Sequence, residues 1–252
     1  MKWTETGAGT IHAAEQRFWV AVGDNADVVA ERMTNGAGFL DSMAQFAVRG
    51  GPQPSMSVAR AREIMGTNVF GVEEGMRHMN VKFRRFELAG FAEVPATDEE
   101  LEEAKETHIL TAVPSISIVT VRKNVTKKNV YREDNTWHLE QAFAARLGMP
   151  GWRLVRKTAV ANSTSKTWGE QQPLLGLNDE VPSSRVLCYA MAGHFLATDK
   201  KLFSDVWVRT SDVDSDNLRV DVKFCSGGVS VDSGSEGDHG DYVGLASVRK
   251  SD

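Results

Sequence analysis

The aspartates of "DVDSDN" alternate with other residues, as oxygen ligands do in a calcium-binding loop. Asp212, Asp214 and Asp216 could supply carboxylates to one cation. An EF-hand also needs glycine at its sixth position and glutamate at its twelfth, and this chain has Asn217 and Lys223 there. The pattern therefore excludes an EF-hand. It favours a polar turn between strands and leaves a looser calcium site open.

Histidine and cysteine are too dispersed to predict a catalytic or metal centre. The six histidines lack the four-residue spacing of a helical zinc site. Cys188 and Cys225 lie far apart without CxxC spacing, so we expect free thiols rather than a zinc site or a disulfide framework. The sequence contains no glycine-rich phosphate loop and no GxSxG nucleophile motif. We expect no enzyme, no metal and no cofactor.

The composition narrows the class of partner. The chain has 252 residues, of which 41% are hydrophobic and 25% charged, and its net charge is −5. These values are typical of a globular protein, and an acidic balance does not attract phosphates, so we expect no nucleic acid partner. No apolar run is long enough to span a bilayer, and "MKWTETGAGT" has no apolar core of a signal peptide. We expect a soluble protein without membrane insertion or a signal peptide.

Helices are predicted in the first third of the chain. Apolar residues recur at helical spacing over residues 11–22, 37–48 and 57–65. A shorter helix is expected over residues 72–79. The Pro- and Gly-rich residues 50–55 are the best linker candidate.

The middle third mixes strands and helices. β-branched residues predict a strand over residues 108–122, and alternation predicts another over residues 151–157. Residues 137–147 are amphipathic and indicate a helix. Two capping boxes mark further helix starts, Thr97 with Glu100 and Thr167 with Glu170.

The last third predicts antiparallel strands. Residues 184–198 and 201–210 flank Asp199-Lys200, which we interpret as a hairpin turn. A second hairpin is expected over residues 218–232, turning at Ser226-Gly227-Gly228. Helices first, then mixed elements and then hairpins indicate an α+β fold with short antiparallel strands and two or more helices.

Alternation in the second hairpin assigns each side chain to a face of the sheet. The inward set is Val220, Val222, Phe224, Val229 and Val231. The outward set is Asp221, Lys223, Cys225, Ser230 and Asp232.

Residues 224–242 consist almost entirely of Ser, Gly, Asp and Val, and the strand-like "YVGLASVRK" follows. Such a composition is typical of disorder, but a hairpin on one side and a strand on the other argue against it. Long loops without a function of their own are uncommon. We interpret the segment as a binding surface of small polar residues on a rigid base.

Several stretches resemble the variable proteins of diversity-generating retroelements. They are "GWRLVRK", "NSTSKTWGEQQPLL", "DEVPSSRVLCYAMAGHFLAT", "KLFSDVWVRTSDVDSDNLRV" and "GLASVRK". The resemblance begins near residue 61 and continues to residue 252. It implies a C-type-lectin-like domain over residues 57–252 with a variable region at about 208–250. Residues 1–55 carry no such resemblance, and their apolar spacing predicts a helical N-terminal segment or small domain over residues 1–56.

In that family a reverse transcriptase copies a template repeat with errors at adenines, and the copy replaces the variable repeat of the gene. The scattered codons never encode Lys, Glu, Gln, Trp or Met, and within residues 224–242 only Glu236 belongs to that set. The resemblance implies an unknown macromolecular ligand, expected to be a protein. The implied recognition surface comprises Asp221, Lys223, Cys225, Ser226, Gly228, Ser230, Asp232, Ser233, Gly234, Ser235, Asp238, His239, Gly240 and Tyr242.

One feature departs from expectation for such a protein: the variable segment has few large side chains that could anchor a ligand, namely His239 and Tyr242. The chain also lacks a C-type-lectin disulfide pair, which members of that family can lack.

Two alternative functions stay open. An oxidase of the formylglycine-generating type shares the fold and would need Cys188 and Cys225 as its paired cysteines. A virion or assembly component would oligomerise through residues 1–56. The expected location is the cytoplasm or a virion, and the sequence does not fix the oligomeric state.

Overall fold

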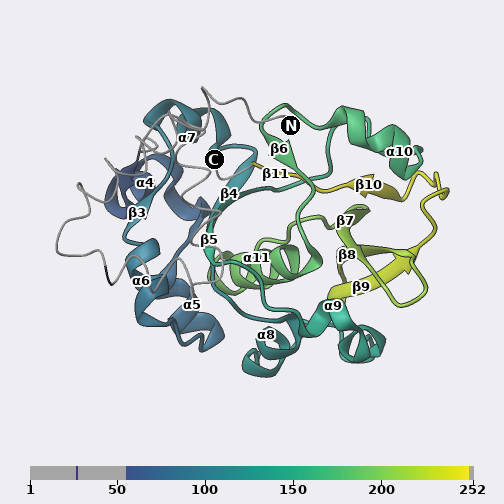
Figure 1. Cartoon of the computed structure of the whole chain (residues 1–252), viewed down its shortest axis with the longest axis horizontal. Coiled ribbons are helices and arrows are strands. Elements are labelled where there is room, and N and C mark those ends of the chain that lie inside the picture. The colour runs from purple at the N-terminus through teal and green to yellow at the C-terminus, as the bar shows by residue number, and fades with distance from the viewer. Residues whose placement is uncertain (1–26, 28–54, 250–252) are drawn as a thin grey trace. The chain divides into compact units, whose positions relative to one another are not determined.

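The computed structural model in Figure 1 describes residue 27 and residues 55–249. The chain divides into two units, Met1–Gln53 and Pro54–Asp252, and residues 55–249 belong to the second. The helices predicted over residues 11–22 and 37–48 lie outside the described residues.

The described part alternates short helices with short strands. Its α-helices are α4 (Val58–Met65), α5 (Val72–Met79), α6 (Arg85–Gly90), α7 (Asp98–Ala104), α8 (Ile118–Asn124), α9 (Ala142–Ala145), α10 (Trp168–Gln171) and α11 (Ser184–Thr198). Its 3-10 helices are η2 (Gly66–Asn68), η3 (Trp137–Glu140) and η4 (Gln172–Leu174). Its strands are β1 (Met56–Ser57), β2 (Val69–Phe70), β3 (Glu93–Val94), β4 (His108–Val113), β5 (Gly151–Arg156), β6 (Asp179–Glu180), β7 (Trp207–Val213), β8 (Arg219–Cys225), β9 (Gly228–Gly234), β10 (Val243–Leu245) and β11 (Val248–Arg249). The mixed α and β architecture is confirmed.

A five-stranded sheet has the order β2-β4-β5-β11-β6. Its centre is the antiparallel pair of β4 and β5, in register from His108 opposite Arg156 to Val113 opposite Gly151. The last described strand, β11, lies between β5 and β6 and pairs antiparallel with both. The chain therefore leaves this sheet, builds a second one and returns.

Both faces of the β4–β5 pair are buried. One face joins a hydrophobic cluster through Ile109, Val113 and Val155. The other face joins a second cluster, with α4 and α7, through Leu110, Ala112, Trp152 and Leu154. Burial on both sides explains why β4 reads as a continuous apolar run rather than an alternating one.

The second sheet has four strands in the order β10-β7-β8-β9. The predicted hairpin is confirmed, because β8 and β9 pair antiparallel from Arg219 opposite Gly234 to Cys225 opposite Gly228. The inward set is confirmed too, since all five of its side chains are at most 1% exposed: Val220, Val222, Phe224, Val229 and Val231.

Residues 184–198 form helix α11, so the strand predicted there is wrong. Residues 184–194 are all buried, and a helix that is apolar all round shows no helical period in its sequence. Six of its 15 residues are Ala, Leu or Met, which favour helix. Asp199 ends α11 with φ 56° and is not a hairpin turn; its N–H donates to the carbonyl of Phe195 at 2.8 Å.

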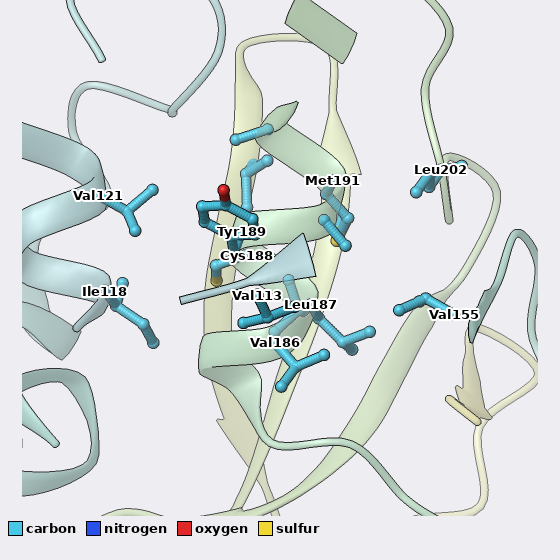
Figure 2. Packing of buried hydrophobic residues seen from close by; sticks show 14 of the residues in the cluster. Val113, Ile118, Val121, Val155, Val186, Leu187, Cys188, Tyr189, Met191 and Leu202 are labelled. Carbon is cyan, nitrogen blue, oxygen red and sulfur yellow. The ribbon is translucent and has the colours of Figure 1, made fainter. Parts of the chain in front are cut away.

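Helix α11 packs against both sheets and fills the main core. Figure 2 shows its side chains directed to opposite sides, toward Val121 and Ile118 on one and toward Val155 and Leu202 on the other. The ring of Tyr189 meets Phe70 of β2 edge-on, with 5.7 Å between ring centroids. One buried helix thus holds the two sheets together.

The other expectations divide as follows. The helices over 58–65 and 72–79, strand β5 and the capping boxes at Thr97 and Thr167 are confirmed. The strand predicted over 108–122 ends at Val113, because the Ser117 hydroxyl accepts a hydrogen bond from the Thr120 N–H and starts α8. The helix predicted over 137–147 is two short pieces, η3 and α9.

No helix in the described part of the chain is long and apolar enough to cross a membrane.

Candidate functional site

The closing loop, defined as residues 235–242, links β9 to β10 and is held through its main-chain carbonyls. The guanidinium Nη2 of Arg209 donates to the carbonyls of Ser235 and Asp238, at 3.2 and 2.6 Å. The main-chain N–H of Trp168 donates to the carbonyl of Glu236 at 2.9 Å. Each of these donors lies outside the loop, and within it the Asp238 N–H also donates to the carbonyl of Ser235, at 3.1 Å.

The same pattern continues to the end of the closing loop. The Ser165 N–H donates to the carbonyl of Gly240 at 3.1 Å, and the Trp207 N–H donates to that of Tyr242 at 2.9 Å. Since a carbonyl is present in every residue type, these bonds do not depend on the loop's side chains.

Arg209 is the central anchor of the closing loop. It is fully buried on β7, and its Nη1 donates to the carbonyl of Lys166 and to Oε1 of Gln171, both at 3.1 Å. Gln171 is buried as well and donates to the carbonyl of Ser163 at 2.7 Å. The guanidinium therefore ties the loop to α10 and to the segment before it.

Arg219 supports the start of the loop from β8. Its guanidinium lies 4.0 Å from the ring centroid of Trp168 and forms an ion pair with Glu236. Together with Arg209 it gives the loop a fixed base of two arginines and a tryptophan.

The predicted surface residues fall into three exposure classes. The exposed ones are Ser226, Asp232, Ser235, His239 and Tyr242. The half-buried ones are Lys223, Cys225, Ser233, Gly234, Asp238 and Gly240. The expectation that all of these residues lie on the surface is wrong for three of them, because Asp221 and Ser230 of the outward set and also Gly228 are buried.

The burial of Gly228 and Ser230 has a local cause. The main chain of Tyr131 bridges Val229 in parallel, and the N–H of Val229 donates to the carbonyl of Val130 at 2.8 Å. A Cβ on Gly228 would meet this main chain at 2.8 Å. Segment 130–132 therefore covers this end of β9, and the sequence gives no sign of it.

Asn135 closes the same edge of β9 further along. Its side chain accepts from the N–H of Val231 at 2.8 Å and donates to the carbonyl of Val231 at 2.9 Å. The indole of Trp137 donates to that carbonyl at 2.8 Å. An amide side chain thus takes the place of a neighbouring strand and leaves the edge paired.

The surface residues form two groups. Cross-strand pairing places Lys223 opposite Ser230 and Cys225 opposite Gly228, at the hairpin end near segment 130–132. The second group, at the closing loop, comprises Asp221, Asp232, Gly234, Asp238 and Tyr242.

Two carboxyl groups of the second group, those of Asp221 and Asp238, have pKa values shifted in opposite directions. Burial raises the pKa of Asp221 to about 7, although the nearby Arg209 opposes the rise. Hydrogen bonds from the Gly240 N–H and the Tyr242 hydroxyl lower the pKa of Asp238.

The aspartates of the "DVDSDN" turn serve separate structural roles. Asp212 accepts from the N–H and the hydroxyl of Ser184, at 2.8 and 2.6 Å, at the start of α11. Asp214 accepts from the N–H groups of Asp216 and Leu218, both at 2.9 Å. Within residues 55–249 no group of three His, Cys, Asp or Glu side chains could hold a metal ion.

Both cysteines are free thiols. Cys188 is fully buried in α11, and burial raises the pKa of its thiol to about 12. Cys225 is half-buried at the end of β8.

These features define a mixed α and β domain whose second sheet carries an ordered polar loop. In comparisons with family models, curated proteins and solved structures, the chain matches none.

Proposed function

We propose that the chain is a ligand-binding protein, without catalytic activity, whose accessible residues between Asp221 and Tyr242 form a recognition surface diversified by a retroelement. The target is a macromolecule, expected to be a protein. The observation that carries the proposal is the anchoring of the closing loop through its carbonyls by donors outside it.

Carbonyl anchoring suits a surface whose side chains are exchanged. A substitution in the closing loop changes the group that meets a ligand and leaves the hydrogen bonds to Arg209 and Trp168 in place. A loop held in one conformation also loses less entropy on binding. Exposed polar side chains on such a loop can vary at little cost to folding.

A C-type-lectin-like domain is the proposed architecture. The quoted stretches resemble that family, and the described part combines α and β elements as it requires. The antiparallel pairing of β11 with β5 is compatible with a domain in which one long segment leaves the central sheet and the chain then returns to it.

The oxidase alternative has less support. Paired-cysteine chemistry needs a reactive thiolate, and the raised pKa of Cys188 keeps that thiol neutral near pH 7. The virion or assembly alternative concerns residues 1–56, and residues 55–249 offer no observation that favours it.

The proposal predicts a template repeat near the gene. We expect the neighbouring DNA to contain a near-copy of the codons for residues 208–250 that differs almost only where the copy carries adenine. Sequencing a few kilobases on either side of the gene tests this. A copy with mismatches at random bases, or no copy at all, contradicts diversification by a retroelement.

A further inference from the structure

Three charged residues form a row across the second sheet. Arg209 of β7 is the register partner of Asp221 on β8, and Asp221 is the partner of Asp232 on β9. Like charges directly opposite each other on neighbouring strands destabilise a sheet. The paired aspartates therefore carry a cost that the fold alone does not explain.

Asp221 is the more costly member of the pair. Its side chain is 6% exposed, and its buried Oδ1 has no hydrogen-bond partner. Burying a charge is unfavourable unless it is paired and hydrogen-bonded. Arg209 donates to four oxygen atoms of other residues through its two Nη atoms, and Arg219 pairs with Glu236. Within the described part of the chain, neither arginine forms an ion pair with Asp221, although Nε of each is also buried without a partner.

Gly234 leaves an opening beside this carboxylate. A Cβ at Gly234 would stand 3.5 Å from Oδ2 of Asp221 and 3.9 Å from Oδ2 of Asp238, with no other atom within 4 Å. Asp232 lies two residues earlier on β9 and so faces the same side. We name Gly234 with these three aspartates the acidic notch.

We propose that the acidic notch binds an arginine side chain of the protein ligand. A guanidinium fits because its planar fork can donate to two carboxylates at once, and Oδ2 of Asp221 and Oδ2 of Asp238 both lie beside Gly234. A metal ion fits less well, because the three aspartates of the notch are not among groups that converge on a metal within residues 55–249. The inference rests on the proposed function and names the chemistry of its target.

The pH response should distinguish the acidic notch from a general acidic surface. Asp221 has a pKa of about 7, and the charged groups around it are Arg209, Arg219, Asp232 and Asp238. A bound cation favours the ionised carboxylate. Binding should therefore strengthen as the pH rises from 6 to 8, a range where an ordinary aspartate no longer titrates.

The test uses the full chain and two short peptides. Acetyl-Gly-Arg-Gly-amide is the probe, and the same peptide with neutral citrulline in place of arginine is its control. We expect the arginine peptide to shift the NMR signals of Gly234 and Asp221 and to bind about tenfold more tightly than the citrulline peptide, as charge-assisted hydrogen bonds imply.

Two glycine variants separate the notch from the rest of the loop. G234A adds a methyl group 3.5 Å from Oδ2 of Asp221 and 3.9 Å from Oδ2 of Asp238 without changing any charge, and we expect it to abolish binding of the arginine peptide. G237A is the matched control, because Gly237 is exposed and a Cβ there would meet only the Ser235 hydroxyl, at 3.7 Å. D221N, which keeps the shape, should also lose binding.

Three outcomes overturn the acidic notch: equal binding of both peptides, unchanged binding in G234A, or saturation of the same residues by calcium with displacement of the peptide. None of these outcomes bears on the template repeat. A repeat found without peptide binding therefore refutes the notch alone, and an absent repeat refutes the diversification alone.

Discussion

Arg209 shows how much one residue contributes to this molecule. It is a fully buried cation that donates to the carbonyls of Lys166, Ser235 and Asp238 and to Gln171. Without the guanidinium all four acceptors would lose this donor, and the Ser235 carbonyl would keep only the N–H of Asp238. The order of the closing loop thus depends on a side chain outside it.

We predict that R209M destabilises the protein by about 3 kcal/mol, because buried acceptors lose charge-assisted hydrogen bonds. Urea unfolding measures the loss, and hydrogen exchange of residues 237–241 should accelerate more than that of β4. R60M is the control, since Arg60 makes exposed ion pairs with Glu63 and Asp98, and such pairs contribute little to stability. Equal effects of both substitutions would contradict the anchoring role.

Residue patterns predict the side of the sheet on which a side chain lies better than they predict whether that side chain is buried. Alternation places Asp221 and Ser230 on the side away from the valines, but neighbouring residues cover both of them. In the same way, "VWVRTSD" places an arginine within an apolar strand, and nothing in the sequence gives its four acceptors. Contacts between segments far apart in sequence decide such details.

At the scale of elements, helix starts that are marked by local signals are predicted well, and fully buried elements are predicted poorly. Capping residues fix the starts of α7 and α10, because the interaction spans three residues of sequence. The sequence of helix α11 predicts a strand because the helix is buried on all sides, so its apolar residues show no helical spacing. The edge contact of Asn135 with Val231 joins residues 96 positions apart and has no local signal.

The closing loop is anchored to the rest of the domain mainly through its carbonyls. We therefore predict that the triple variant D232N/S235N/H239N unfolds within about 1 kcal/mol of the wild-type protein, because exposed substitutions cost little. Urea denaturation followed by tryptophan fluorescence provides the measurement. A loss as large as that of R209M would mean that the side chains hold the loop, and would argue against a variable surface.

At the scale of the whole molecule, three buried histidines couple folding to pH. His108, His138 and His194 are at most 5% exposed, and burial is the main cause that lowers each pKa from 6.5 to about 4. The folded protein holds them neutral, whereas the unfolded chain takes up protons below pH 6.5. Stability should therefore be fully present above pH 6.5 and fall as the pH drops toward 4.

Asp221 acts in the opposite sense, since its folded pKa of about 7 exceeds the ordinary 3.8 and acidification between these values stabilises the fold. Three histidines outweigh one aspartate, so we predict a lower urea midpoint at pH 4.5 than at pH 7. H138L should reduce this difference, because both ring nitrogens of His138 lack partners in the fold. H239N, at an exposed position, should not, and a pH-independent midpoint would contradict the prediction.

The position of β11 has a consequence for how the protein is made. Val248 and Arg249 form an inner strand of the five-stranded sheet, between β5 and β6, yet the ribosome adds them after the closing loop. A frameshift or a stop codon within residues 224–242 would leave that sheet without an inner strand. Under the proposed function, a rewritten gene with a broken reading frame yields chains that cannot finish folding. Such chains become substrates for proteolysis, so only products of intact reading frames accumulate.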